Sequence, residues 1–517
     1  MPAHITLLVR RWPSLDRIHC GQFLQAASLQ SSSSAIILMV LFGLAWIGHL
    51  SSVALTAPMD NIEQWVWSHS LQWGYHKHPP LPTWLLALPQ LLTGSTALTS
   101  QILGALCTLA SVMIFANLIR QIWGQQHAWI ALLAGLCITF YNGRLNYYNH
   151  NVLLMLCVSM SAHCWWMILT TGRTRWWLGL GISAGLGMLS KYQYLLVLAP
   201  STFMIWQLKP WRNKQQLRGL GLAILAATVL SLPHLWWLLQ QDIANSPIRY
   251  ALKTSRPDFL QTAIPITNRL HSGVWLMDLL FNRCLPAILI LLIVKALCQP
   301  VTTDHKPNNS NAISGNHFLL IWGILPPLCI TLLGLFLGMD LQMQWGTAFA
   351  LWIIPPLMML LKLHQRQVHQ KHTWIVLSFF VLIQSLLMVH SYQTSAFGCC
   401  AQPASTRWRL FNSPVLAKEL VDSASDSVGG HFKVIVGPAT AAGAVAMAME
   451  DHPKVLIDGN LKISPWIHHE ELQEPGVIQL WAPNTGPATQ TRLPSGWGWS
   501  PYLSLAQQPK ADLPTRP

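Results

Sequence analysis

The chain has 517 residues, of which 52% are hydrophobic and only 10% are charged. A soluble domain usually carries about 25% charged residues. The net charge of +14 would suggest a nucleic-acid partner in a soluble protein. Here the basic residues lie mostly in short loops between long apolar runs, so we exclude nucleic acid and expect a multi-pass protein of the lipid bilayer.

Apolar runs recur along the first 390 residues. A helix that crosses a bilayer needs about 20 such residues. We therefore predict about eleven spans, at 35–55, 97–119, 127–142, 150–170, 175–190, 192–208, 219–240, 275–298, 317–338, 344–363 and 372–390. The apolar stretch 81–94 is shorter and contains two prolines, which favours a helix that lies in the membrane interface.

The loop charges predict the orientation of these spans. If the N-terminal segment 1–34 is cytoplasmic, most basic loop residues fall on the cytoplasmic side, which is the usual positive-inside pattern. The loop 56–96 then lies on the outer side. Some basic residues fall on that side against the rule, where either a lipid phosphate or anionic head groups would explain them: Lys77, Arg144, Lys191, Arg249, Lys253, Arg256 and Arg269.

The composition changes after the last predicted span. Strands are predicted at 432–436, 454–457 and 476–481, and two stretches have helical spacing, 415–427 and 440–450. The end of the chain, from Ala482, is rich in Pro, Gly and Thr and is expected to be irregular. We therefore divide the chain into the segment 1–34, a transmembrane domain at 35–390 and a small α/β domain at 391–517.

Two acids follow the first span directly. Asp60 and Glu63 lie at the expected membrane surface, where a carboxylate seldom occurs without a role. Asp60 is either a catalytic base or the N-cap of the next helix. Glu63, at i+3, shares the face of Asp60. It would bind a divalent metal with Asp60, orient a substrate or complete a capping box.

A cationic turn comes shortly after these acids. Tyr75-His76-Lys77-His78 runs into Pro79-Pro80, and the prolines hold the cluster in a defined conformation. Either Lys77 or a protonated His78 would contact a phosphate. An acid, a cationic turn and a return to lipid together predict a site for a lipid-phosphate substrate.

These residues resemble the first loop of the membrane glycosyltransferases with the GT-C fold. The resemblance rests on Asp60, the aromatic-rich helix after it, Gly74-Tyr75 and the His-Pro-Pro-Leu turn. It is nearest to the bacterial branch of the protein mannosyltransferase family, which includes the lipid A aminoarabinose transferases. It covers about the first 390 residues.

The resemblance implies a mainly α-helical, polytopic enzyme of the bacterial inner membrane with a periplasmic C-terminal domain. Such an enzyme would move a sugar from a polyprenyl (undecaprenyl) phosphate to a lipid, glycan or protein acceptor on the periplasmic side. Asp60 matches the aspartate that the family uses as its base. No cofactor is clearly implied, although Asp60 and Glu63 together would suit a divalent metal.

The chain departs from the family pattern at two places. His78 stands where relatives commonly have lysine, and His150 stands where they often have an aspartate. Asn149 and His150 would therefore either hydrogen-bond a sugar or cap the helix that starts there. Lys191-Tyr192 matches a Lys-Tyr motif of the family, although Lys191 would also suit a lysine that snorkels to the interface. The remaining substrate-binding candidates are Arg144, Arg256 and Trp345.

A polytopic lipid or solute transporter, or a flippase, is the alternative function. It would also need cationic residues in a cavity. It predicts inverted repeats and helices broken near the midplane, and neither is evident in the sequence. The charged residues gather instead at one side of the membrane, which favours an enzyme at the surface.

Overall fold

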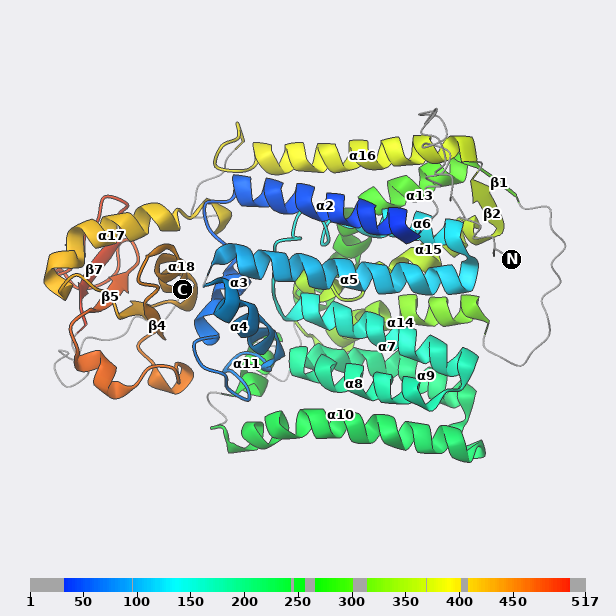
Figure 1. Cartoon of the computed structure of the whole chain (residues 1–517), viewed down its shortest axis with the longest axis horizontal. Coiled ribbons are helices and arrows are strands. Elements are labelled where there is room, and N and C mark those ends of the chain that lie inside the picture. The colour runs from blue at the N-terminus through cyan, green and yellow to red at the C-terminus, as the bar shows by residue number, and fades with distance from the viewer. Residues whose placement is uncertain are drawn as a thin grey trace, which may run out of the picture.

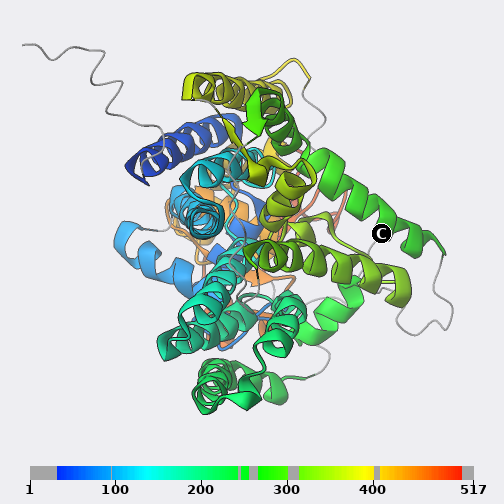
Figure 2. The same ribbon diagram turned by 90° about the vertical axis from the view of Figure 1, so that its right-hand side faces the viewer.

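The structure is a computed structural model, and it describes residues 32–94, 96–242, 246–255, 266–300, 314–368, 370–400 and 408–502. Long, roughly parallel helices form an elongated bundle, and a small sheet domain covers one end of it (Figure 1). Viewed along the bundle, the sheet domain lies behind the central helices (Figure 2). The mainly α-helical class with a C-terminal sheet is thereby confirmed.

Long apolar helices dominate the bundle. Within the described ranges, six are long and apolar enough to cross a membrane: α2 (Ser32–Val53), α5 (Ala97–Trp123), α7 (His150–Thr171), α10 (Lys214–Gln240), α14 (Gly315–Leu337) and α16 (Gln370–Gln393). A bent pair, α12 (Ile266–Met277) and α13 (Leu285–Leu297), makes a seventh span if it is counted as one. A multi-pass membrane protein follows from these helices.

The predicted count of eleven spans is not confirmed. The remaining predicted spans correspond to shorter helices: α6 (Gln125–Leu136), α8 (Thr174–Ser190), η1 with α9 (Tyr192–Val197 and Leu198–Leu208), and η5, η6 and α15 (Met343–Gly346, Ala350–Ile353 and Ile354–Leu360). The predicted span 275–298 is not one continuous helix. The segment Arg269–Arg283, which ends in a π-helical turn at Asp278–Arg283, and the segment Leu285–Leu297, with Pro286 in its first turn, are bent by 53° relative to each other.

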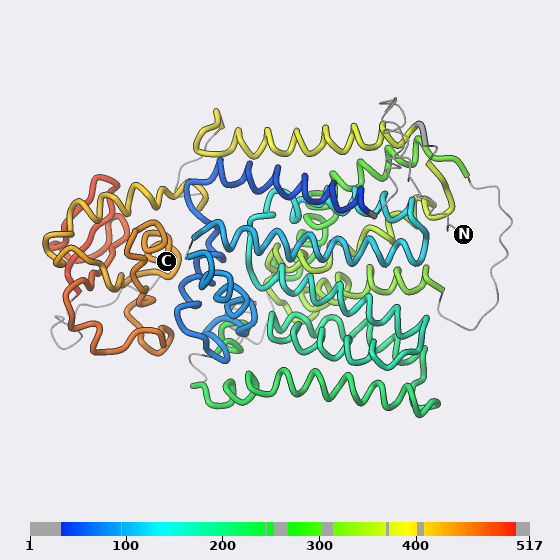
Figure 3. The backbone as a smooth tube through the Cα atoms, in the orientation of Figure 1, coloured from blue at the N-terminus to red at the C-terminus, as the bar shows by residue number. Residues whose placement is uncertain are grey.

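Short helices lie between the bundle and the sheet domain. They are α3 (Met59–Trp67), α4 (Leu81–Thr93) and α11 (Pro247–Ser255). In the backbone trace the blue segment with α3 and α4 lies beside the orange C-terminal part (Figure 3). The first loop is thus a layer between two domains, and α4 is the short helix that the sequence predicts.

The sheet domain contains a mixed sheet of five strands in the order β4-β3-β5-β7-β6. Its parallel strands are β3 (Val434–Gly437), β4 (Lys454–Ile457) and β5 (Val477–Trp481), and they match the three predicted strands closely. Helices α17 (Ser413–Val428) and α18 (Ala439–Ala448) also lie where helical spacing predicts them. The expected irregular end is partly wrong, because β6 (Thr491–Arg492) and β7 (Gly498–Pro501) extend the sheet.

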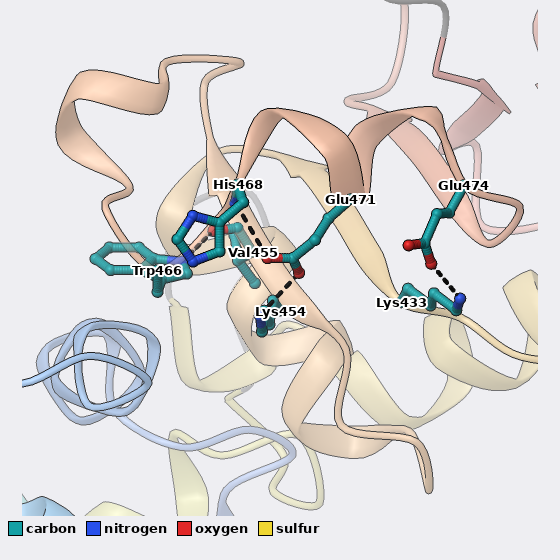
Figure 4. Close-up of polar contacts among 7 residues, drawn as sticks. All are labelled: Lys433, Lys454, Val455, Trp466, His468, Glu471 and Glu474. Atoms are coloured by element: carbon teal, nitrogen blue, oxygen red, sulfur yellow. Dashed lines mark hydrogen bonds and ion pairs between the residues drawn. The ribbon is translucent and has the colours of Figure 1, made fainter.

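Polar contacts fix the segment after β4 to the sheet (Figure 4). Lys454 on β4 donates to Glu471 at 2.8 Å, and Lys433 beside β3 pairs with Glu474. The Trp466 indole donates to the Val455 carbonyl oxygen at 2.8 Å. These contacts hold the segment, which contains the short 3-10 helices η10 (Leu461–Ile463) and η11 (His469–Gln473), against the parallel strands.

The buried residues form one core inside the bundle and a second core in the sheet domain. The second core includes four residues of α3, namely Ile62, Trp65, Val66 and Trp67, in one cluster with residues from α17, α18 and the strands. Helix α3 therefore belongs structurally to the sheet domain, although it follows the first membrane helix in the chain. The predicted segment 1–34 lies almost entirely outside the described residues.

Candidate active site

Helix α3 carries the two acids that the sequence singles out. It begins after Pro58 and has no side-chain N-cap hydrogen bond, so the capping alternative for Asp60 is wrong. Asp60 lies in the first turn instead, and its side chain is partly exposed. Asp60, Glu63, Gln64 and Trp67 follow helical spacing, so they share one face of α3.

Asp60 is held at the N-terminus of α7. The Asn149 side-chain amide donates to Asp60 Oδ2 at 2.7 Å. The Asn149 side-chain oxygen accepts from the backbone N–H groups of Asn151 and Val152, so the same residue caps α7. Capping and orientation of the acid are therefore combined in one side chain. The positive end of the helix dipole also favours the Asp60 carboxylate at this place.

Glu63 and Lys77 form an ion pair across the first loop. Glu63 is only 9% exposed, and burial raises the pKa of its carboxyl although the Lys77 ammonium opposes this. The ammonium of Lys77 also lies 5.5 Å from the centre of the Tyr250 ring in α11. Lys77 thus has one anionic partner already and points into the region that contains Glu63.

The loop conformation that places Lys77 is closed by backbone hydrogen bonds. Tyr75 N donates to His78 O at 3.0 Å, and His78 N donates to Tyr75 O at 3.3 Å. Tyr75 stacks on Trp67 of α3, with ring centres 5.1 Å apart. The cationic turn is therefore the tight turn that the two following prolines predict, and it is packed against α3.

His78 and His150 lie face to face, with ring centres 3.8 Å apart and 35° between their planes. Burial lowers the pKa of His78 well below its usual value, and His150, Lys191 and Lys77 act in the same direction. His78 is therefore neutral near pH 7. Of the two phosphate-binding alternatives in this turn, Lys77 is the one that carries charge.

Lys191 follows α8 and approaches the same group of residues. Its ammonium donates to Asn151 Oδ1 at 2.7 Å and lies 5.8 Å from the centre of the Trp345 ring. The Gln193 side chain donates to the Trp345 carbonyl oxygen at 3.0 Å, and this hydrogen bond fixes the backbone at Trp345. Burial lowers the pKa of Lys191 to about 8, while the charge of Asp60 opposes that shift. Lys191 is therefore paired within the protein and close to Asp60.

The other predicted residues are placed differently. Arg144 lies over the rings of Phe140 and Tyr147, at 6.0 and 5.5 Å from their centres. The Tyr192 hydroxyl contacts His234 Nε2 of α10 at 2.8 Å, rather than the residues around Asp60. Arg256 lies outside the described residues. The structure therefore brings together Asp60, Glu63, Lys77, His78, Asn149, His150, Lys191 and Trp345 through linked contacts.

Asn61 is a residue of this site that the sequence does not single out. It is fully buried and donates from Nδ2 to Ser100 Oγ and to the Asn146 carbonyl oxygen, both at 2.9 Å. Its Oδ1 accepts from Tyr148 N at 2.8 Å. Asn61 therefore ties α3 to the segment before α7, next to the contact between Asp60 and Asn149. Its partners lie 39 and 85 positions away in the chain, so no local sequence signal marks Asn61.

Replacement of Asn61 by leucine should destabilise the protein. Leucine has a similar volume but leaves three hydrogen-bonding partners without Asn61, which costs about 2–4 kcal/mol in total. Thermal unfolding in detergent should show a clear fall in the apparent Tm. Replacement of the exposed Gln121 in α5 by leucine is a surface control, and an Asn61 variant as stable as that control would contradict the assigned role.

The metal hypothesis was tested against the donor set. Among the described residues, no group of three or more His, Cys, Asp or Glu side chains is arranged to hold a metal ion. Asp60 accepts from an amide and Glu63 is paired with an ammonium, and these are not the surroundings of metal ligands. A divalent ion at this site stays a prediction, and no chemical step below depends on it.

Sequence comparisons point to one group of enzymes. A family model described as "Dolichyl-phosphate-mannose-protein mannosyltransferase" matches residues 77–237, a range that contains Lys77, Asn149, His150 and Lys191 but not Asp60. The "Undecaprenyl phosphate-alpha-4-amino-4-deoxy-L-arabinose arabinosyl transferase 2" of Pseudomonas fluorescens is 30% identical over 320 residues, which is 56% of this chain and 50% of the relative. The "Lipid A galacturonosyltransferase RgtD" of Rhizobium johnstonii is 24% identical over 226 residues, 43% of this chain and 46% of the relative.

A solved structure decides the fold. ArnT from Cupriavidus metallidurans, bound to undecaprenyl phosphate, aligns with a TM-score of 0.60 at 12% sequence identity, over 93% of this chain and 100% of that chain. The chain has the GT-C fold. The resemblance to the protein mannosyltransferase family is confirmed by the family model over residues 77–237. In sequence, the chain spans about half the length of the curated relatives it matches, 46% and 50% for the two named above.

Proposed function

We propose that this GT-C protein is a membrane glycosyltransferase that moves a sugar from a polyprenyl (undecaprenyl) phosphate to an acceptor at the outer face of the membrane. One observation carries the proposal. Asp60 is oriented at the N-terminus of α7, and two lysines, Lys77 and Lys191, approach the same group of residues from different loops. One acid beside two cations suits a reaction that needs a base and releases a phosphate.

The reaction follows from these groups. The bond between the anomeric carbon of the sugar and the phosphate oxygen breaks, and both electrons of that bond stay on the phosphate. Lys191 and Lys77 stabilise the added negative charge on the leaving polyprenyl phosphate. The acceptor hydroxyl oxygen forms a bond to the anomeric carbon, and Asp60 accepts its proton. Asn149 keeps the Asp60 carboxylate in its orientation throughout.

The relatives indicate the substrate class. The Pseudomonas fluorescens relative is named for undecaprenyl phosphate-linked 4-amino-4-deoxy-L-arabinose. The Rhizobium johnstonii relative is named for lipid A. We extend both to this chain as a proposal: a polyprenyl-phosphate-linked sugar as the donor and a lipid acceptor in preference to a glycan or protein. The chain matches only about half of each relative in sequence, so the identity of the sugar stays open to the assay below.

We also propose that the protein lies in the bacterial inner membrane with its sheet domain in the periplasm. The orientation is supported by basic residues at the end of the bundle away from the sheet domain. These residues include Arg120 in the last turn of α5, Lys209 after α9, Lys214 at the start of α10 and Lys295 in the last turn of α13. The positive-inside rule makes that end cytoplasmic.

Reconstitution tests the proposed function. Purified protein in proteoliposomes would receive undecaprenyl phosphate carrying a labelled sugar, either 4-amino-4-deoxy-L-arabinose or galacturonate, together with lipid A. Label should move to lipid A with one of the donors. A flippase would instead move the intact donor to the other leaflet without transfer, and that result would favour the alternative function.

The affinity for undecaprenyl phosphate should depend on pH through Lys191. Its pKa is lowered to about 8, so the ammonium is mostly present at pH 7 and mostly lost at pH 9. Because the phosphate binds the ammonium form, affinity should fall about tenfold between these pH values. The Lys191→Arg variant keeps its charge over this range and should bind with little pH dependence. If the affinities of the wild type and of Lys191→Arg depended on pH in the same way, Lys191 would not be a phosphate ligand.

A further inference from the structure

Helix α3 has two faces that contact different domains. Asp60, Glu63, Gln64 and Trp67 face the first loop and α7. Ile62, Trp65 and Val66 repeat the spacing of Asp60, Glu63 and Gln64 two positions later along the helix. Ile62, Trp65 and Val66 are at most 1% exposed and belong to the core of the sheet domain. The catalytic acid and the packing face are therefore carried on the same short helix.

The chain that leads into α3 is also held by the sheet domain. Leu55 N donates to Arg409 O at 3.2 Å, and Trp408 Nε1 donates to Ala57 O at 2.8 Å. Ser413 Oγ donates to Thr56 Oγ1 at 3.0 Å. All three contacts precede Asp60 by a few residues, so they limit where α3 can start.

Helix α18 approaches α3 through a glycine. A methyl group at Gly443 would lie 2.6 Å from Ile62 Cγ2 and 2.8 Å from Val66 Cγ2, which is closer than carbon atoms can approach. Gly443 therefore sets the spacing between the sheet domain and the helix with the acid. At its other end, α3 meets the domain where the Trp65 and His452 rings lie 6.2 Å apart.

A helix of nine residues is not stable on its own, because helix nucleation is costly. Its position must come from its surroundings, and residues 408–457 form one side of these surroundings. We propose that the sheet domain is the positioning element of the active site, and that Gly443, through Ile62 and Val66, sets the position of Asp60 against Asn149. This inference rests on the proposed function and assigns the C-terminal domain a part in it.

The Gly443→Ala variant tests the proposal in the full-length protein in proteoliposomes. The added methyl group should push α3 away from α18 and shift Asp60. Because small displacements of a catalytic group are costly, kcat should fall about 10- to 100-fold. Lys191 and Lys77 do not belong to α3, so the KM for the donor should change by no more than about threefold. Because a loss of folded protein also lowers the apparent kcat without changing KM, kcat is calculated per molecule that elutes as a monodisperse peak in gel filtration.

The rescue variant and the control are matched to the contact. Ile62→Ala removes the nearer of the two methyl groups that Gly443→Ala strikes, so the double variant should recover part of the lost kcat. Gly221→Ala makes the same change in α10, where a new Cβ meets no atom within 4 Å, and it should leave kcat unchanged. Trp408→Phe keeps an aromatic side chain but removes the indole N–H that donates a hydrogen bond to Ala57 O. It should lower kcat partially even if Gly443→Ala does not fold.

A second readout separates this inference from the proposed function. Amide hydrogen exchange in 59–67 should be faster in the Gly443→Ala variant than in the wild type and should slow again in the double variant. If the wild type transfers no sugar, the proposed function fails while exchange still tests the positioning. Full kcat in a folded Gly443→Ala protein would overturn the inference. Exchange in 59–67 that does not change in that variant would overturn it too.

Discussion

Replacement of Asp60 by asparagine is expected to lower the rate of sugar transfer by about a thousandfold. Asparagine keeps the shape of the side chain, and its oxygen can still accept from the Asn149 amide as Asp60 Oδ2 does at 2.7 Å. It cannot accept the proton of the acceptor hydroxyl. Initial rates in proteoliposomes with a labelled polyprenyl-phosphate sugar measure the loss.

The controls for this variant separate chemistry from folding. The apparent Tm and the affinity for undecaprenyl phosphate should stay close to those of the wild type. Asp242→Asn removes an exposed acid in the segment after α10 and should leave transfer unchanged. Transfer at the wild-type rate by a folded Asp60→Asn protein would exclude Asp60 as the base.

Replacement of Lys77 by methionine should have the second largest effect, and it should affect stability as well as binding. Glu63 is 9% exposed and would lose its partner. A buried charge left without its counter-charge is costly, and because Lys77 is itself partly exposed we expect about 2–3 kcal/mol. The variant should therefore show a lower apparent Tm in detergent at pH 7.

The pH dependence and a double variant check this explanation. Burial raises the folded-state pKa of Glu63 above its unfolded value, and loss of Lys77 removes the charge that opposes the shift. The difference in apparent Tm between the wild type and the Lys77→Met variant should therefore become smaller as the pH falls and Glu63 takes up a proton. Lys77→Met with Glu63→Gln should recover most of the Tm. Strictly additive losses from the two single changes would show that the residues do not interact.

The double variant also isolates the contribution of Lys77 to binding. Once stability is recovered, the remaining loss of affinity for undecaprenyl phosphate belongs to the missing ammonium. We expect this affinity to stay below that of the Glu63→Gln protein, because Lys77 then no longer contacts the phosphate. Equal affinities would restrict Lys77 to a structural role as the partner of Glu63.

The sequence predicted those parts of the site that depend on local features. An acid directly after a membrane helix singled out Asp60, and polar residues at a helix start singled out Asn149, which both caps α7 and binds Asp60. Lys191 was found because a lysine between apolar runs needs a partner, and that partner is Asn151. These are short-range patterns, and they hold in the folded protein.

Contacts between distant segments could not be predicted in the same way. Asn61 bonds to residues 39 and 85 positions away, and Tyr250 reaches Lys77 from α11, so no local pattern marks either residue. The neutral state of His78 also depends on packing against His150. Tertiary structure decides these features.

Backbone geometry and tertiary contacts, which no local pattern encodes, also explain the errors in the predicted fold. Hydropathy alone did not indicate the bend between α12 and α13, because a π-helical turn is a change of backbone geometry that the hydropathy of the residues does not encode. It also did not distinguish full spans from the shorter helices α6 and α15. Strands β6 and β7 are short and form through pairing with β5, so the Pro- and Gly-rich sequence gave little sign of them.

We propose that a lipid phosphate binds beside Asp60, between Lys77 and Lys191. A structure of the protein in nanodiscs with undecaprenyl phosphate, determined by electron cryo-microscopy, would locate this phosphate. We expect a phosphate oxygen about 2.7–2.9 Å from the Lys191 ammonium, on the side of α3 that carries Asp60. Phosphate density at the opposite end of the bundle, near Arg120, with no density beside Lys191, would contradict it.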